Sequence, residues 1–256
     1  ASAPVLRNNT IQENTAASNG GAIFVNNQSQ PTIEQNTISR NVANGSGGGV
    51  IFLSSSGSLR GNQILDNRAA VNGGGVLINT ANPEVTDNVI KGNTAAQLGG
   101  GLVLLADSPT EVRRNTISSN QATTGGGVFL TGVPQVRLED NLLESNQATQ
   151  GGGGMAMVGS HPRMVNQAIR GNQGGQYGGG LLIQGGSQPQ VTNSVIGFNT
   201  AGAGGGVSAA DSPNLLFTDN QVVGNQALTS LGGAMFLLNT QGNISRNQFV
   251  SNTANG

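Results

Sequence analysis

Residues able to perform acid–base or metal chemistry are sparse in this sequence of 256 residues. It contains no cysteine, a single histidine, His161, and six aspartates: Asp66, Asp87, Asp107, Asp140, Asp211 and Asp219. Clustered carboxylates would indicate a calcium site, because hard cations prefer oxygen ligands. These aspartates are dispersed along the chain, and Asp107 and Asp211 each precede Ser-Pro, where a turn-forming side chain is expected. We predict no catalytic residue, no cofactor and no metal site, with His161 a solvated corner residue.

The overall composition narrows the class of protein further. Charged residues make up 9% of the chain and the formal net charge is -1, so no basic surface for nucleic acid or an anionic membrane is expected. No apolar stretch approaches the roughly 18 residues that a membrane-spanning helix needs. Glycine is abundant at 42 residues and apolar clusters recur regularly. This pattern favours a repetitive folded chain over a disordered one.

The elements that would position any functional residue are specified by a repeat that covers the whole chain. An asparagine recurs every 26 or 27 residues, at Asn14, Asn41, Asn67, Asn93, Asn120, Asn146, Asn172, Asn199, Asn225 and Asn252. A second series lies five residues earlier and is interrupted by Gln167 and Ser194: Asn9, Asn36, Asn62, Asn88, Asn115, Asn141, Asn220 and Asn247. The unbroken period predicts a single domain over residues 1–256.

Each repeat also contains the turn residues that typically separate short strands. A triad of small residues, such as Gly73 to Gly75, precedes one apolar segment, and a proline such as Pro109 precedes another. A leucine-rich repeat would place a helix over the triad, where each glycine would cost about 0.8–1 kcal/mol. We therefore predict an all-β fold, a right-handed parallel β-helix (β-solenoid) of about ten coils of 26–27 residues, with three short strands per coil.

Stacked coils place equivalent residues about 4.8 Å apart, so each position must tolerate its own copies as neighbours. Asparagine suits this condition, because its amide can donate to one copy and accept from another. We also expect it to adopt the left-handed backbone conformation at a corner. One inward column should contain Ile23, Val50, Val76, Leu102, Val128, Met155, Leu181, Val207 and Met235. A second should contain Val25, Phe52, Ile78, Leu104, Leu130, Met157, Ile183, Ala209 and Leu237.

Short motifs within the repeats resemble those of a known family. GGAI at 20–23, GGAM at 232–235 and FVSN at 249–252 are similar to the GGA(I/L/V) and FxxN motifs of chlamydial polymorphic outer-membrane proteins. The passenger regions of that family are β-helical adhesins. More broadly, the whole chain resembles the right-handed parallel β-helix superfamily that includes pectate-lyase-like proteins. The resemblance implies the fold, and it makes an adhesin passenger one candidate function.

The same superfamily contains polysaccharide-active enzymes, and GSH at 159–161 resembles an element of polygalacturonases. The paired aspartates and basic residues that accompany it in that family are not recognisable. Because the spacing never exceeds 27 residues, no long loop is expected to wall a substrate cleft, and the chain has no tryptophan to stack on a sugar. We expect no enzyme activity. A carbohydrate or host-surface ligand is compatible with the fold, though no residue pattern identifies one.

The surface and the ends of the predicted solenoid point to self-association. Residues between the two inward columns should face outward and form an apolar stripe for lateral contact: Phe24, Ile51, Leu77, Val103, Phe129, Leu182 and Phe236. No helix or polar repeat is expected to cover either end, so apolar residues there are candidates for end-to-end contact: Val5, Leu6, Ile11, Ile244 and Phe249.

We therefore expect either an excerpt of a longer β-helix or a subunit that stacks head to tail, with about one strand missing at each junction. The leading prediction is a structural protein, extracellular or at the cell surface, that associates with itself head to tail as a fibre subunit. A β-helical adhesin passenger segment of a longer surface protein is the alternative. A polysaccharide-active enzyme ranks third.

Overall fold

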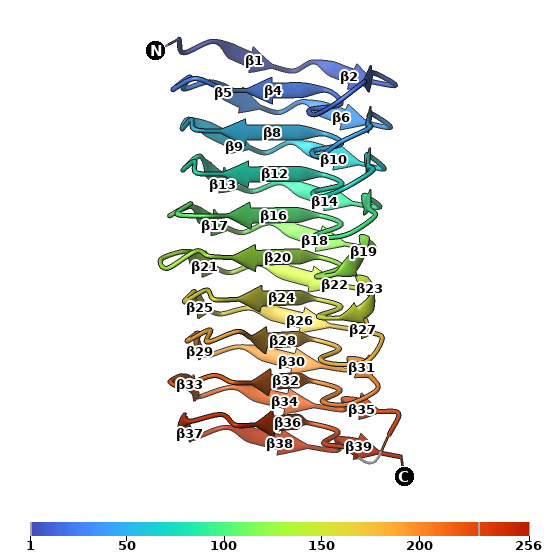
Figure 1. Ribbon diagram of the computed structural model, residues 1–256, viewed down its shortest axis with the longest axis vertical. Coiled ribbons are helices and arrows are strands. Elements are labelled where there is room, and N and C mark those ends of the chain that lie inside the picture. Colours follow the sequence, from blue (N-terminus) through green and yellow to red (C-terminus); the bar gives the residue numbers. More distant parts are fainter. Residues whose placement is uncertain (1, 230, 256) are drawn as a thin grey trace.

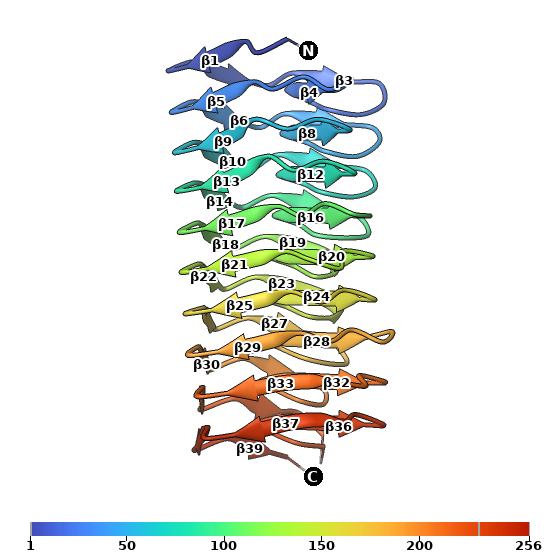
Figure 2. The ribbon, with the colours of Figure 1, turned by 90° about the vertical axis from the view of Figure 1, so that its left-hand side faces the viewer.

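The protein is a parallel β-solenoid in its computed structural model, which describes residues 2–229 and 231–255. Figures 1 and 2 show from two sides how the coils stack into a rod with the two chain termini at opposite ends. Within the described residues, 39 short strands form four parallel sheets along the rod, here called A to D. None of these residues lies in a helix, so the described chain offers no helical membrane span.

Sheets A and B hold the first two strands of each coil. Sheet A consists of β1 (Val5–Arg7), β5 (Thr32–Glu34), β9 (Ser58–Arg60), β13 (Glu84–Thr86), β17 (Glu111–Arg113), β21 (Arg137–Glu139), β25 (Arg163–Val165), β29 (Gln190–Thr192), β33 (Leu215–Thr218) and β37 (Gly242–Ser245). Sheet B consists of β2 (Thr10–Gln12), β6 (Thr37–Ser39), β10 (Gln63–Leu65), β14 (Val89–Lys91), β18 (Thr116–Ser118), β22 (Leu142–Glu144), β26 (Ala168–Arg170), β30 (Val195–Gly197), β34 (Gln221–Val223) and β38 (Gln248–Val250).

Sheet D is built from the strands that follow the glycine triads. It consists of β4 (Ile23–Val25), β8 (Val50–Leu53), β12 (Val76–Asn79), β16 (Leu102–Leu105), β20 (Val128–Thr131), β24 (Met155–Val158), β28 (Leu181–Gln184), β32 (Val207–Ala210) and β36 (Met235–Leu238). The described residues thus supply nine strands to sheet D and ten to each of the other sheets.

The β-solenoid predicted from the repeat is confirmed, with one addition. Each of the first nine coils has four strands rather than three, because the residues directly after the main asparagine pair with their copies as sheet C. It consists of β3 (Thr15–Ala16), β7 (Val42–Ala43), β11 (Arg68–Ala69), β15 (Thr94–Ala95), β19 (Gln121–Thr124), β23 (Gln147–Gly151), β27 (Gln173–Gly174), β31 (Thr200–Ala201), β35 (Gln226–Ala227) and β39 (Thr253–Ala254).

The sharp corners of each coil are made by left-handed residues, but these are not the ladder asparagines, so that expectation is wrong. The left-handed residue immediately precedes the asparagine, as in Asp87 (φ 58°) before Asn88 and Ser119 (φ 55°) before Asn120. This residue turns the chain, and the asparagine that follows can then point inward and stack on its copies. Glycine is therefore not required at either place.

The glycine triads have two separate roles, illustrated by Gly73 to Gly75. Gly73 adopts a φ of 66°, which L side chains rarely tolerate. A Cβ on Gly74 would lie 2.5 Å from the carbonyl oxygen of Gly100 in the next coil, and one on Gly75 would lie 2.7 Å from that of Gly101. The triad is therefore needed both for the turn and for the close stacking of backbones.

The core is a continuous column of aliphatic side chains inside the four sheets. Strand pairing keeps like residues in register, so that Ile38, Ile64 and Ile90 lie on successive strands of sheet B. Both predicted inward columns are buried in the interior coils. Their members at the two ends, such as Ile23 and Leu237, are only partly covered.

Candidate functional site

The main asparagine series forms a buried ladder along the corner between sheets B and C. In the interior coils Asn120 is representative. Its backbone N–H and its Nδ2 both donate to Oδ1 of Asn146 at 3.0 Å, and Nδ2 also donates to the carbonyl oxygen of Ile90 at 2.9 Å. Its own Oδ1 accepts from the backbone N–H and Nδ2 of Asn93 at 2.9 and 3.0 Å. The amide is fully satisfied although it has no contact with solvent.

The second series forms a similar ladder at the corner between sheets A and B, and it continues through its two substitutions. Gln167 accepts from Nδ2 of Asn141 at 3.3 Å, and its backbone N–H donates to Oγ of Ser194 at 3.0 Å. The backbone N–H of Ser194 in turn donates to Oδ1 of Asn220 at 2.9 Å. A side-chain oxygen at this position is sufficient to continue the ladder, although Gln167 and Ser194 make fewer hydrogen bonds than an asparagine does.

A third polar series, at the corner between sheets D and A, was missed from the sequence. Its buried serines lie one or two residues before a corner proline in four coils: Ser108, Ser160, Ser187 and Ser212. The backbone N–H of Ser160 donates to Oγ of Ser187 at 3.1 Å, and that of Val133 donates to Oγ of Ser160 at 3.2 Å. The recurrence of serine shortly before proline was the available signal.

The residues predicted for end-to-end contact belong to β1 and β2 at one end of the rod and to β37 and β38 at the other (Figure 1). At the N-terminal face, Val5 is 62% exposed, and Leu6 and Ile11 are half-buried. Leu6 also lines a hollow of about 310 Å³ with Ile23 and Phe24. At the C-terminal face, Ile244 and Phe249 are exposed, the latter by 46%. The five residues thus lie at opposite ends of the rod, and their role in end-to-end contact stays a prediction.

The predicted lateral stripe points away from the main core, but the expectation that it is exposed is wrong. Ile51, Leu77, Val103, Phe129 and Leu182 are all buried and form a second apolar cluster with Ala156. The segment between sheets C and D folds back over them. Leu98 from this segment packs on the cluster, and Asn19, Ser46 and Asn72 line a hollow beside it.

Only the two ends of this stripe reach the surface. Phe24 is 45% exposed, and Phe236 is half-buried. Phe236 stacks on the ring of Tyr177 with their centroids 6.4 Å apart. Lateral contact through the other five residues would require the covering segment to move away. The structure therefore does not support the predicted lateral contact.

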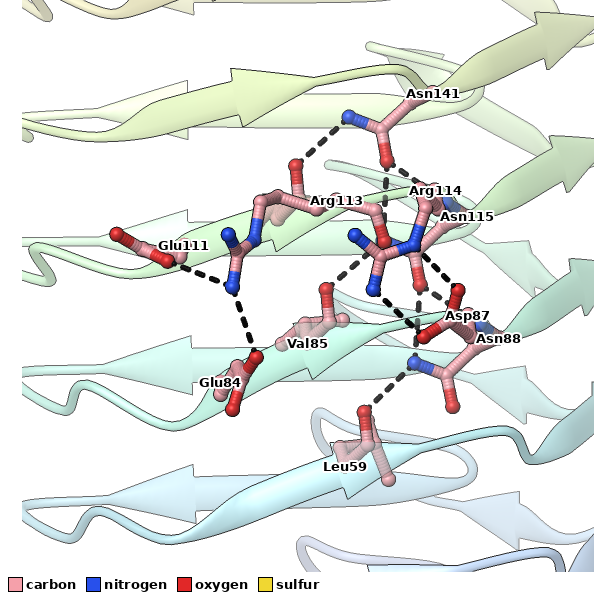
Figure 3. A network of polar contacts seen from close by, with 11 residues as sticks. Leu59, Glu84, Val85, Asp87, Asn88, Glu111, Arg113, Arg114, Asn115 and Asn141 are labelled. Atoms are coloured by element: carbon pink, nitrogen blue, oxygen red, sulfur yellow. Dashed lines mark hydrogen bonds and ion pairs between the residues drawn. The ribbon is translucent and has the colours of Figure 1, made fainter.

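Charged residues on the outer face of sheet A and at its corner with sheet B form ion pairs, most of which join neighbouring coils (Figure 3 shows those of Arg113 and Arg114). Arg113 bridges Glu84 and Glu111 at 3.1 Å each. Arg114 contacts Asp87 through two bonds of 2.8 and 2.9 Å. These bonds lower the pKa of the Asp87 carboxyl and raise the pKa of the Arg114 guanidinium.

Similar pairs hold other coils together. Hydrogen bonds from Arg60 and Arg7 lower the pKa of Glu34, and bonds from Arg246 lower the pKa of Asp219. Most arginines of the described chain are therefore used between coils of the rod itself.

The six aspartates are dispersed along the rod, whereas His161 shares an open hollow with Glu111. His161 lies at a corner, where its Nδ1 accepts from the backbone N–H of Gln188 at 3.1 Å, and it lines an open hollow of about 290 Å³ with Arg137 and Arg163. All six aspartates have positive φ, as expected of turn-forming residues. Within residues 2–229 and 231–255, no group of three or more His, Asp or Glu could hold a metal ion.

Comparison with known proteins gives one family match. The model of the family described as right handed beta helix region matches residues 2–141 and 100–256, which together span nearly the whole chain. No curated protein and no solved structure matches it. The match agrees with the handedness predicted from the sequence and with the stacked parallel sheets of the structure. The chain therefore belongs to the right-handed β-helix family.

Proposed function

We propose that the chain is a non-enzymatic structural protein, extracellular or at the cell surface, that associates with itself head to tail as a fibre subunit. One observation carries the proposal. The two end faces expose the same apolar columns that a neighbouring coil buries everywhere else in the rod. Ile117 and Ile169 have no exposed surface, whereas Phe249, in the same column of sheet B, is 46% exposed.

The gain from covering these faces is large enough to drive association only if several columns are buried together. Burying one aliphatic or aromatic side chain contributes about 1.5–3 kcal/mol, whereas association costs about 4–15 kcal/mol in lost freedom of motion. Stacking a second copy on the C-terminal face would cover Ile244 and Phe249 with Leu6 and Ile11, and would pair three strand edges at once. These combined gains support a specific contact between end faces.

Sheet D sets a constraint on this contact. Sheets A, B and C would continue from β37, β38 and β39 of one copy to β1, β2 and β3 of the next. Sheet D ends at β36, one strand short of the level of β4 in a second copy. The junction would hold a gap one strand wide on this side, beside the exposed Leu237 and Leu238 of one copy and Phe24 of the other.

The remaining surface supports a structural rather than a catalytic function. Eight of the twelve carboxylates pair with an arginine, and six of these eight contact an arginine of a neighbouring coil, as Glu34 does with Arg7 and Arg60. The hollows on the sides of the rod are shallow and are lined by residues of consecutive coils, without an inserted loop. A location outside the cell rests on the resemblance of the GGAI and FVSN motifs to those of adhesin passengers.

The experiment is to measure assembly of the purified chain over a wide range of concentration. Sedimentation velocity should show species that grow with concentration, and electron microscopy should show unbranched filaments one rod wide. Phe249→Asp should abolish growth, because it places a charge in the end face. Val195→Asp, at an exposed outward position on sheet B, is the matched control and should assemble like the parent chain. Monomers that persist at the highest concentrations would contradict the proposal.

A further inference from the structure

We propose that a hollow on the side of the rod, at the corner between sheets D and A, binds a tetrahedral oxyanion through Arg137, Arg163 and His161. The inference goes beyond the proposed function and does not depend on it. The hollow has a volume of about 290 Å³, and Glu111 and Gln135 also contribute to its lining. It is formed by interior coils, where β21 and β25 each have a neighbour in sheet A on both sides.

The two arginines occupy neighbouring positions in one outward column of sheet A. Strand pairing places Arg137 directly beside Arg163, with Glu111 on the preceding strand and Gln190 on the following one. Neighbouring parallel strands lie about 4.8 Å apart, so the two guanidinium groups extend from adjacent points on the sheet. Like charges in such positions repel each other, which is unfavourable unless a charge of opposite sign lies between them.

The preceding coils show how the protein itself neutralises a pair of like charges in this column. Glu84 and Glu111 are the first residues of the adjacent strands β13 and β17. Arg113 reaches between them and contacts a carboxylate oxygen of each at 3.1 Å (Figure 3). One cation thus bridges two anions. Because Glu111 is already engaged in this way, it offsets only part of the positive charge at the hollow.

The arginine pair has no comparable bridge within residues 2–229 and 231–255. Arg137 forms its ion pair with Glu139 of its own strand, at 2.9 Å. Arg163 forms none with these residues, whereas eight of the ten arginines in the chain pair with a carboxylate. An anion from solution can therefore lie between Arg137 and Arg163 as Arg113 lies between the two glutamates.

His161 supplies a third donor to the same hollow. Its Nδ1 accepts a hydrogen bond from the backbone N–H of Gln188 at 3.1 Å. A ring nitrogen that accepts a hydrogen bond carries no proton, so the proton of the neutral ring is on Nε2. The His161 side chain lies at the surface, two residues before Arg163. The hollow is thus lined by two guanidinium groups and an imidazole N–H.

A tetrahedral oxyanion suits this set of donors better than a carboxylate does. A single guanidinium presents two parallel N–H groups, which are sufficient for both oxygens of a carboxylate. Phosphate and sulfate carry additional oxygens, so one ion can accept from both arginines and from His161 at once. A free ion and a phosphate or sulfate monoester of a larger molecule offer this same chemistry.

Titration of the purified chain with inorganic phosphate and with inorganic sulfate, at constant ionic strength, tests the site. His161 is the only histidine, so its ring protons give isolated signals in NMR spectra. These signals should shift saturably with a Kd on the order of 1 mM, and the Tm followed by circular dichroism should rise. Acetate should bind about tenfold more weakly. Signals that do not shift, or that respond equally to acetate, would overturn the inference.

Methyl phosphate distinguishes the two sources of the ligand. Binding as tight as that of inorganic phosphate would support a site that accepts the ester group of a larger molecule. Binding of inorganic phosphate but not of methyl phosphate would assign the site to the free ion.

Substitution of Arg163 tests the arginine pair. Arg163→Gln should weaken phosphate binding about tenfold. Arg68→Gln is the matched control, because Arg68 is an exposed arginine of sheet C that also forms no ion pair with the described residues, and it should bind like the parent chain. Arg163→Glu places a carboxylate beside Arg137, so it should abolish binding while keeping or raising the Tm without phosphate. Equal binding by Arg163→Gln and Arg68→Gln would overturn the inference.

Discussion

Interior and terminal coils of this rod use the same residue columns in very different environments. Phe129 in the middle of the outer cluster is 4% exposed, whereas Phe24 at the equivalent position of the first coil is 45% exposed. Leu104 is fully buried, whereas Leu237 in the same column is 43% exposed. The strands have similar lengths in both regions, but a terminal strand pairs with one neighbour instead of two, so the difference in exposure arises from the missing neighbouring coil.

This contrast shows that burial in a solenoid is a property of adjacent coils rather than of the coil that carries the residue. Stability is then approximately a sum of interfaces between neighbours, and a terminal coil has only one. Identical substitutions should therefore have large effects in the interior and small ones at the ends. Matched pairs of substitutions can test this expectation directly.

Truncation of a core residue should give the largest difference in stability loss between an interior coil and a terminal coil. Ile117→Ala removes a fully buried side chain between two coils, and we expect a loss of about 4 kcal/mol in the free energy of unfolding. Phe249→Ala, in the same column at the C-terminal face, should cost about 1 kcal/mol or less in the monomer, because half of this side chain is already in water. Urea unfolding of both variants measures the difference. Equal losses would contradict the dependence on neighbours.

Substitutions in the outer cluster should also destabilise an interior coil more than a terminal one, by a somewhat smaller amount. Phe129→Ser should destabilise the fold by about 3 kcal/mol, because the ring lies between sheet D and the segment that covers it. Phe24→Ser should change stability little. A surface stripe would instead give small effects at both positions, so similar small losses in urea unfolding would contradict the burial of Phe129.

The fold was predictable because the period constrains every coil in the same way. The spacing of Asn14 to Asn252 gave the number of coils, and alternation around residues such as Val76 and Ile78 gave the inward columns. Alternation also correctly placed Leu77 on the opposite side of sheet D. It could not show that Leu77 is covered, because the covering segment has no period of two and its path depends on positive φ at Gly73.

The corners show a second limit of reasoning from residue types. The left-handed position before the asparagine is often filled by Gly, Asn or Asp, which favour that conformation, but residues such as Ser119 and Phe198 also occupy it, so residue type marks the corner only in part. The direction in which the ladder asparagines donate could not be predicted from the sequence either, because it depends on the hydrogen bonds of the structure.

Removal of a ladder asparagine should lower the free energy of unfolding moderately more in an interior coil than in the last coil. Asn120→Ala deletes side-chain bonds to Asn146 and Ile90 and leaves the donors of Asn93 without their acceptor, and we expect a loss of about 2–3 kcal/mol. Asn252→Ala deletes bonds on one side only, and its surroundings admit water, so about 1 kcal/mol is expected. Urea unfolding again measures both variants. Equal losses would show that the ladder does not depend on a neighbour on each side.

Removal of a charged pair on the surface should have the smallest effect on stability. This effect should be the same in an interior coil and at the end of the rod. Arg114 lowers the pKa of Asp87 in an interior coil, and Arg246 lowers the pKa of Asp219 where the last coil meets its neighbour. A lowered pKa means that the stabilisation is fully present above the unfolded-state value near pH 4 and is lost as the pH falls through the lower folded-state value.

Asp87→Asn and Asp219→Asn should each shift the Tm at pH 7 by only about 1 °C, because both pairs are exposed to solvent and screened. The two variants should converge with the parent chain as the pH falls through the lowered pKa values of the parent carboxylates, because these carboxylates then become protonated. Thermal unfolding followed by circular dichroism between pH 2 and 7 measures these shifts. Unlike the apolar columns, each ion pair needs only the two coils that it joins. A much larger shift for Asp87 than for Asp219 would show that its pair depends on coils beyond those two.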